Sequence, residues 1–340
     1  MKPSRYCSGL SRVLTSASAQ ATRSLAVRAA IAGGQWTRLW RGTGTMTGVA
    51  KAPDRWHRWL MDERFGGDPA ARERLLPELL YPVRDTVLDK AGLQPGDTVL
   101  DVGTGDGLIA FGALEWLGPS GQVVFCDISQ DLLDHCRAAA AAEGLLDRCR
   151  FILASADSLG GIADASVDVV TTRSVLIYVT DKAEALQAFY RVLRPGGRIS
   201  VFEPIGVLIR DRDRLLGYDV TPVKPLAARI AAFYQSIQPP APDPMLDFDE
   251  RDLVRHAEQA GFGDISLELR VTVKNGKRPV PWETCLRIAQ NPLVPPLGEV
   301  LDQVLSPQEI TDFTAHLKPL VESGTGQERQ ALAYLAAAKS

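Results

Sequence analysis

The chain has 340 residues, enough for one large domain or two small ones. With 45% hydrophobic and 23% charged residues, its composition is that of an ordinary globular protein. The formal net charge of −3 argues against a nucleic-acid partner, because such proteins favour a basic surface, and no apolar run is long enough for a transmembrane helix.

The cysteines are scattered along the chain and form no C-x-x-C pair. This spacing suggests neither a zinc site nor a disulfide framework. We therefore expect no bound metal and a reducing, cytoplasmic location.

The N-terminal segment differs in composition from the rest of the chain. Residues 1–53 contain no Asp or Glu and are rich in Arg, Ser and Ala, which is typical of an organellar transit peptide. A transit peptide over residues 1–45 would make the protein mitochondrial. We prefer a true start at Met46, because the segment lacks a sustained amphipathic period. In either case we expect residues 1–50 to be disordered and the folded domain to span 51–340.

Two helices are predicted before the first strand. A short helix begins near Arg55, and the Gly- and Pro-containing stretch 65–69 ends it. The second runs from about residue 70 to 91 and is bent or restarted near Pro77 and Pro82, because proline removes a helical hydrogen bond.

The stretch from Thr98 to Gly107 reads T-V-L-D-V-G-T-G-D-G and is followed by an apolar helical pattern over 108–117. It predicts a buried strand that turns tightly into a helix. Glycines at alternate positions allow positive φ and close approach of a ligand to the main chain, and the helix N-terminus offers free N–H groups. We interpret it as a nucleotide-binding loop.

Downstream, strands and helices alternate as in a β-α fold. Strands are predicted over 122–126, 150–154, 167–172, 198–202, 264–273 and 329–338, and helices over 131–143, 181–193, 226–236, 249–260 and 307–322. Two proline-rich segments, 205–248 and 275–325, interrupt this pattern. We expect them to form a lid over the carboxyl ends of the strands, with a helical dimerisation arm as the alternative.

The spacing Asp101-x-Gly103-x-Gly105-x-Gly107 resembles the first motif of class I S-adenosylmethionine (SAM)-dependent methyltransferases. The same glycines also fit a looser dinucleotide motif, Gly105-x-Gly107-x-x-Ala110, and a purely structural turn is a third possibility. Asp101 favours the methyltransferase, since the dinucleotide motif does not use a carboxylate there. The Leu-Arg-Pro-Gly-Gly-Arg turn over 193–198 is a second point of similarity to small-molecule methyltransferases of the type 11/25 kind.

This resemblance implies an α/β, Rossmann-like fold with a seven-stranded, mostly parallel sheet, an antiparallel last strand, helices on both faces and helical lid insertions. The core would comprise residues 85–205, 249–273 and 329–338.

The resemblance also implies where SAM binds. Asp127 would take the ribose hydroxyls, Ile128 would pack on the adenine, and Asp157 would contact the adenine amino group. Asp101 would reach the methionine ammonium. The implied cofactor-binding residues are Asp101, Gly103, Thr104, Gly105, Gly107, Asp127, Ile128, Ala156, Asp157, Arg173 and Ser174.

Methyl transfer from a sulfonium is an in-line displacement, so a base is needed only where the acceptor must lose a proton early. Glu203, at the end of the fifth strand, and His57, in the first helix, are the candidate catalytic residues, with Tyr178 and His256 as further possibilities. For each of the four we favour a structural role.

The predicted function is transfer of a methyl group from SAM to a small-molecule acceptor, by a monomer or homodimer without a nucleic-acid partner. No Asn/Asp-Pro-Pro-Tyr/Phe motif, which marks methylation of nucleic-acid base amines, is present in the sequence. The alternatives are an NAD-dependent oxidoreductase and a non-catalytic SAM-binding partner subunit.

Overall fold

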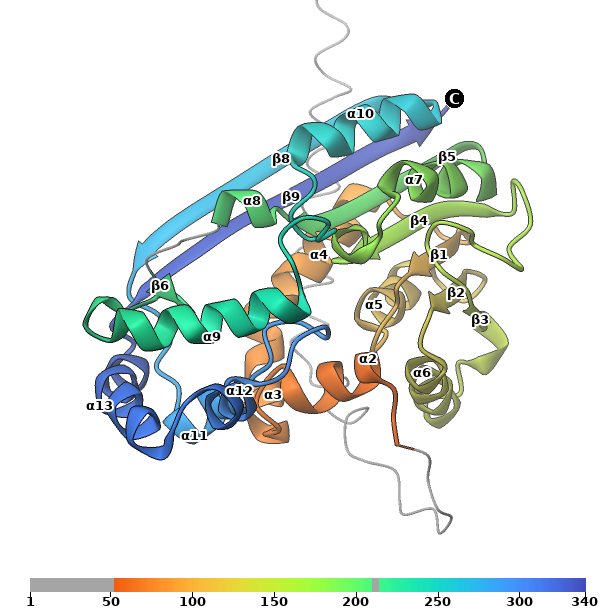
Figure 1. Cartoon of the computed structure of the whole chain (residues 1–340). Helices are drawn as coiled ribbons and strands as arrows, with labels where there is room; N and C mark the ends of the chain where they lie inside the picture. The colour runs from red at the N-terminus through yellow and green to blue at the C-terminus, as the bar shows by residue number, and fades with distance from the viewer. Residues whose placement is uncertain (1–51, 210–213) are drawn as a thin grey trace, which may run out of the picture. The chain divides into compact units, whose positions relative to one another are not determined.

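The computed structural model describes residues 52–209 and 214–340, so the prediction for residues 1–50 lies outside the described residues. A seven-stranded sheet with the order β3-β2-β1-β4-β5-β9-β8 forms its centre (Figure 1). The strands are β1 (Thr98–Val102), β2 (Gln122–Asp127), β3 (Cys149–Leu153), β4 (Val167–Arg173), β5 (Leu193–Pro204), β8 (Phe262–Asn275) and β9 (Gln327–Lys339). Within these described ranges, no helix is long and apolar enough to cross a membrane.

The strand directions confirm the predicted sheet. Strands β1 to β5 pair in parallel, whereas β9 runs antiparallel to both of its neighbours, β5 and β8. The strand order reverses between β1 and β4, which is the switch point where ligands bind in open α/β sheets. Strands β8 and β9 form a hairpin whose last pair is Asn275 with Gln327, and the second insertion connects them.

Helices cover both faces of the sheet. They are α4 (Tyr81–Ala91), α5 (Leu108–Trp116), α6 (Gln130–Ala142), α7 (Lys182–Val192) and α10 (Glu250–Ala260), and α2 (Arg55–Arg58) and α3 (Pro69–Leu75) precede them in the chain. Ile199 and Val201 of β5 join the apolar cluster that contains α7 and α10. Ser200, between them, points the other way and donates to the carbonyl of Val87 in α4 at 2.8 Å. This alternation places α4 opposite α7 and α10.

Both N-terminal helical segments contain a π-helical turn, and the second of these lies at the predicted interruption near Pro77. Helix α2 continues as a π-helical turn over Trp59–Glu63, and a second π-helical turn, Leu76–Leu80, separates α3 from α4. Pro77 lies in that second turn and Pro82 in the first turn of α4.

The two insertions contain more regular structure than the sequence predicted. Helices α9 (Lys224–Ile237) and α13 (Pro307–Ser323) confirm the predicted ones. The elements that were missed are α8 (Gly206–Ile209), β6 (Arg214–Leu215), β7 (Tyr218–Asp219), α11 (Trp282–Arg287) and α12 (Leu297–Val304). All of them are shorter than nine residues, too short to show a clear hydrophobic period.

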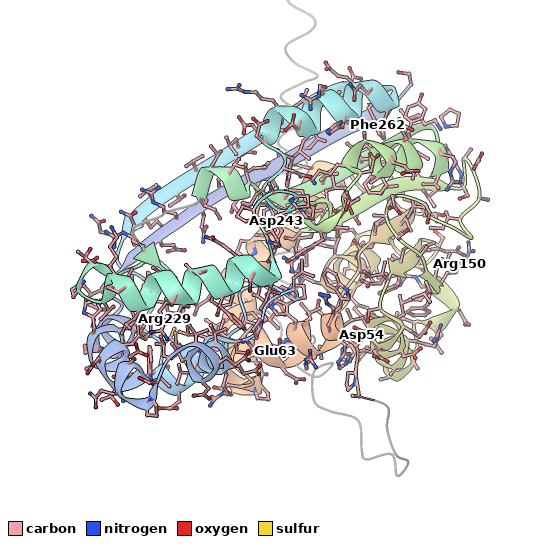
Figure 2. All side chains as sticks on the ribbon, viewed as in Figure 1. Asp54, Glu63, Arg150, Arg229, Asp243 and Phe262 are labelled. Atoms are coloured by element: carbon pink, nitrogen blue, oxygen red, sulfur yellow. The ribbon has the colours of Figure 1, made fainter. Side chains whose placement is uncertain are left out.

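The insertions pack together. Ile230 of the first insertion shares one buried apolar cluster with Trp282 and Phe313 of the second. Arg229 of α9, labelled in Figure 2, forms an ion pair with Glu309 of α13 at 2.5 Å. The two proline-rich segments therefore form one helical layer, although the core helix α10 separates them in sequence.

Candidate active site

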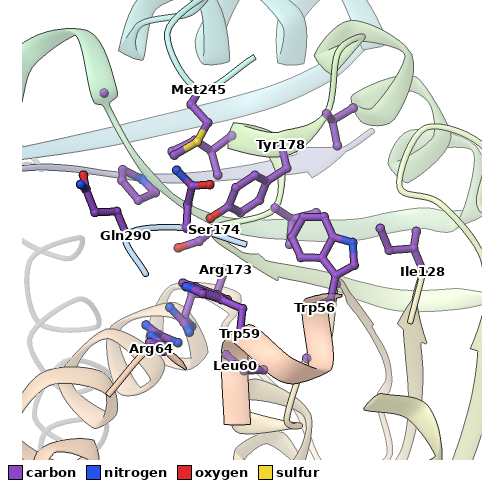
Figure 3. Close-up of a pocket in the computed structure, with 18 of the residues that line it drawn as sticks. Trp56, Trp59, Leu60, Arg64, Ile128, Arg173, Ser174, Tyr178, Met245 and Gln290 are labelled. Atoms are coloured by element: carbon purple, nitrogen blue, oxygen red, sulfur yellow. The ribbon is translucent and has the colours of Figure 1, made fainter. Parts of the chain in front are cut away.

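A cavity of about 970 Å³ opens at the carboxyl ends of β1, β2 and β4, and residues of both insertions contribute to its lining (Figure 3). This volume lies at the upper end of the range of about 300–1,000 Å³ for ligand pockets, so it has room for more than one small molecule. The predicted cofactor residues that line it are Asp101, Gly103, Thr104, Gly105, Asp127, Ile128, Ala156, Asp157, Arg173 and Ser174.

The glycine loop has the backbone conformation that its sequence predicted. Gly103 has φ +63°, and a Cβ placed there would lie 2.3 Å from Cγ2 of Val175. Gly107, by contrast, does not line the cavity. A Cβ on Gly107 would meet the ring of Phe111 at 2.5 Å, so this glycine serves the close turn into α5 rather than contact with a ligand.

Asp101 is buried at the end of β1, with its side chain in the cavity wall. Its two carboxylate oxygens accept hydrogen bonds from the hydroxyls of Thr104 and Thr171, both at 2.8 Å. Burial raises the pKa of Asp101 to about 7. A cation bound beside it would favour the ionised form. Thr171, which the sequence reasoning did not select, fixes the orientation of this carboxylate from the neighbouring strand.

Asp127 ends β2 and joins the glycine loop to the next turn. Its Oδ2 accepts the N–H of Gly105 at 2.8 Å, and its Oδ1 accepts the N–H of Ser129 at 2.9 Å. Burial raises the pKa of this carboxyl. The N-cap of α6 is Ser129 itself, whose hydroxyl accepts the N–H of Leu132. A carboxylate has about four lone-pair sites, so Asp127 can still accept a hydrogen bond from a ligand in the cavity.

Next to Asp127, Ile128 exposes 52% of its surface although it is a large apolar residue. Ala156 and Asp157 follow β3 on the same side of the cavity. The Asp157 carboxylate accepts a hydrogen bond from the hydroxyl of Ser155. An exposed isoleucine beside a fixed carboxylate is suited to a flat, partly polar ring.

Arg173 and Ser174 lie where β4 ends at the cavity. Ser174 has φ +57°, an unusual value for a residue with a side chain, and such strain concentrates at functional sites. Its N–H donates to the carbonyl of Phe202 at 2.8 Å, which holds the strained turn against β5.

Glu203 does not line the cavity, contrary to the expectation for a candidate base. Its fully buried carboxylate accepts the N–H groups of Val175, Leu176 and Ile177 at 2.9, 2.9 and 3.0 Å. Burial raises its pKa to about 7. The geometry makes Glu203 a positioning residue that anchors the turn after β4.

His57 also lies outside the cavity lining. Its ring meets that of His135 edge-on at a centroid distance of 6.4 Å, and its buried Nδ1 has no hydrogen-bond partner among the described residues. Its neighbours Trp56 and Trp59 do line the cavity. The indole N–H of Trp59 donates to the carbonyl of Ala289 at 3.0 Å, which ties this helix to the second insertion.

The sequence reasoning missed several lining residues, which include Arg64, Tyr234, Met245, Gln290 and Asn291. A signal existed only for Arg64, because it follows Leu60 by four residues and so shares its helical face. Nothing in the local sequence marks the others, since long-range packing of the insertions brings them to the cavity.

Comparison with known proteins gives matches to methyltransferases. Residues 82–233 match the ubiE/COQ5 methyltransferase family. The ubiquinone/menaquinone biosynthesis C-methyltransferase UbiE of Hahella chejuensis is 34% identical over 180 residues, which cover 52% of this chain and 70% of that protein. The enzyme of the same name from a Marinomonas species is 38% identical over 118 residues, 34% of this chain and 46% of that protein.

The match to the Marinomonas protein thus spans about half of its length. Among solved structures, phosphoethanolamine N-methyltransferase 2 of Haemonchus contortus in complex with SAM aligns with a TM-score of 0.46 at 18% identity. That alignment covers 84% of this chain and 56% of the other.

Proposed function

This chain belongs to the ubiE/COQ5 methyltransferase family, and we propose that it transfers a methyl group from SAM to a small-molecule acceptor. The observation that carries the proposal is the junction of β1, β2 and the glycine loop. There the Asp127 carboxylate binds the loop amide of Gly105 and lines the cavity beside the exposed Ile128. A carboxylate with free lone pairs suits a vicinal diol, and an exposed apolar side chain suits a purine face.

In this proposal the remaining predicted residues contact different parts of the cofactor. Ala156 and Asp157 receive the adenine edge, and the backbone of Gly103 and Gly105 lies against the amino-acid part. Asp101, held by its two threonine partners, accepts the ammonium group. Arg173 and Ser174 face the methionine end from the neighbouring strand.

The acceptor would occupy the part of the cavity formed by the N-terminal helix and the insertions. Trp56, Trp59 and Tyr178 line this part, and the rings of Trp56 and Tyr178 meet edge-on with centroids 5.1 Å apart. Aromatic walls suit a ring-bearing acceptor. The relatives are named C-methyltransferases of ubiquinone and menaquinone biosynthesis, which is consistent with such an acceptor.

Methyl transfer depends mainly on the positioning of the reactants, because the methyl group of a sulfonium is already activated. Holding the nucleophile, the methyl carbon and the sulfur in line supplies much of the rate. Burial raises the pKa of Tyr178 to about 12, so its phenol stays protonated and can donate a hydrogen bond to the acceptor. We propose that the helices of both insertions act as a lid that excludes water from this step.

The test is parallel calorimetric titration of the full chain with SAM, S-adenosylhomocysteine (SAH) and NAD. We expect micromolar binding of the first two ligands and none of NAD. Binding of NAD alone would contradict the proposal and favour the oxidoreductase alternative. Binding of SAM without methyl transfer to any of a broad panel of ring-bearing acceptors would favour the non-catalytic alternative.

A further inference from the structure

Two arginines face the same cavity without a carboxylate partner. Arg64 ends the π-helical turn that follows α2, and Arg173 ends β4 (Figure 3). Among the described residues, neither guanidinium group makes an ion pair or a side-chain hydrogen bond. The guanidinium of Arg64 lies over the rings of Trp59 and Phe65, at 5.3 and 5.5 Å from their centroids.

The two charges are close enough to affect each other. Burial and the neighbouring charge of Arg173 lower the pKa of Arg64 to about 9, and burial lowers the pKa of Arg173. Both groups still carry a positive charge near neutral pH. Two partly desolvated cations facing one cavity are unfavourable unless an anion joins them.

The acidic residues of the cavity do not fill this role by contact, because each has another partner. Those acidic residues are Asp101, Asp106, Asp127, Asp157 and Asp243. Asp106 has the strongest claim among them, since its charge favours the cationic form of Arg64 and of Arg173. Its ion pair, however, is with Arg72 at 2.8 Å. Asp243 accepts hydrogen bonds from Gln238 and from the backbone of Met245. The other three lie on the side proposed for the cofactor.

The cofactor alone would not neutralise the pair. SAM carries a sulfonium and an ammonium cation and one carboxylate, so it brings a net positive charge into the cavity. Its carboxylate can pair with one guanidinium group. Arg173, at the end of β4, is placed for the methionine end, which leaves the guanidinium of Arg64 beside the aromatic wall.

We propose that the acceptor is an anion, with a carboxylate or phosphate group on a ring-bearing body, and that Arg64 binds that oxyanion while Trp56 and Tyr178 contact the ring. A guanidinium group matches both oxyanions because its forked N–H groups can bind two oxygens at once. The inference rests on the proposed function, because it assigns the acceptor class for that same site.

The experiment measures binding to the full chain saturated with SAH, by calorimetry at low salt and neutral pH. Benzoate and phenyl phosphate are the anionic probes, and methyl benzoate is the neutral probe of matched shape. We expect at least one anion to bind roughly tenfold or more tightly than the ester, which corresponds to about 1.4 kcal/mol. The tighter of the two anions identifies the oxyanion class.

Arg64→Gln should remove most of this preference and leave the affinity for SAH within about twofold. Arg58→Gln is the matched control, since Arg58 lies on the same helical segment, pairs with Glu63 and does not line the cavity. It should leave both the preference and the affinity for SAH unchanged.

Three results would overturn the inference while the proposed function stands: equal binding of the ester and the anions, no binding of either anion at millimolar concentration, or an Arg64→Gln variant that loses SAH affinity and keeps the preference. The last result would assign Arg64 to the cofactor carboxylate. Failure of the wild-type chain to bind SAH would instead refute the proposed function, and this inference with it.

Discussion

Replacement of Asp127 by alanine tests the proposed cofactor site most directly. In the structure this carboxylate already accepts two backbone N–H groups, from Gly105 and Ser129, and we propose that it also accepts the ribose hydroxyls. Charge-assisted hydrogen bonds contribute roughly 1.5–3 kcal/mol. Asp127→Ala should therefore weaken SAH binding by about 10- to 150-fold, at about 1.4 kcal/mol per tenfold.

The same substitution leaves the two amides without their acceptor, which we expect to cost about 1–3 kcal/mol of folding stability. Calorimetry with SAH would therefore be paired with thermal unfolding, so that lost affinity is not confused with lost fold. Asp127→Asn keeps the shape of the side chain and removes its charge, so its affinity for SAH should lie between those of the wild type and of Asp127→Ala. Asp134→Ala, on the exposed surface of α6, is the control and should change neither quantity. An Asp127→Ala protein that is folded and binds SAH within twofold of wild type would refute the reasoning.

Three further predictions follow from the geometry around this loop. Gly103→Ala should lower the melting temperature and abolish SAH binding, because its Cβ would overlap Val175. Gly118→Ala is the control, since Gly118 has a similar φ and a Cβ there would have nothing within 4 Å. It should show only the backbone penalty of about 1 kcal/mol. Burial raises the pKa of Glu203 to about 7, above the value of about 4.3 for an unfolded chain. The folded state thus binds a proton that the unfolded state releases between about pH 4.3 and 7, so stability should fall as pH rises through that window, and Glu203→Gln should flatten this part of the unfolding profile. Trp59→Phe should cost roughly 0.5–1.5 kcal/mol in urea unfolding through the lost indole hydrogen bond; no change would show that this link to the second insertion contributes nothing.

The sequence predicts the sheet domain well because its signals are local. The run from Thr98 to Gly107 contains the strand, the turn and the helix start, and each of these has its own signature in residue type and spacing. Strand β9 is recognisable at the end of the chain for the same reason. The parallel order of β1 to β5 then follows from the alternation of strands and helices.

The part of the cavity formed by the N-terminal helix and the insertions depends on contacts between distant residues, and the sequence predicts it poorly. The indole of Trp59 reaches Ala289, 230 positions away, and the amide of Asn291 donates to Gln238 across the two insertions. No local sequence pattern indicates which distant residues form such hydrogen bonds. For Arg64 the helical spacing from Leu60 indicates a shared helical face, but only the meeting of the N-terminal helix with β4 shows that Arg64 shares a cavity with Arg173.

Glu203 was selected because ligands bind at the carboxyl ends of the strands in such sheets. This rule identifies the edge of the sheet but not the direction in which a side chain points. Its carboxylate fixes the amide of Val175, and the side chain of Val175 lies 2.3 Å from where a Cβ on Gly103 would be. The buried acid and the glycine of the loop, 100 positions apart, therefore support one contact from its two sides. Because the Glu203 carboxylate holds the N–H of Val175, the turn after β4 cannot readily move away from a side chain at position 103. Glu203, a residue outside the motif, thus helps to require glycine at position 103, and it acts on this loop through packing rather than through chemistry.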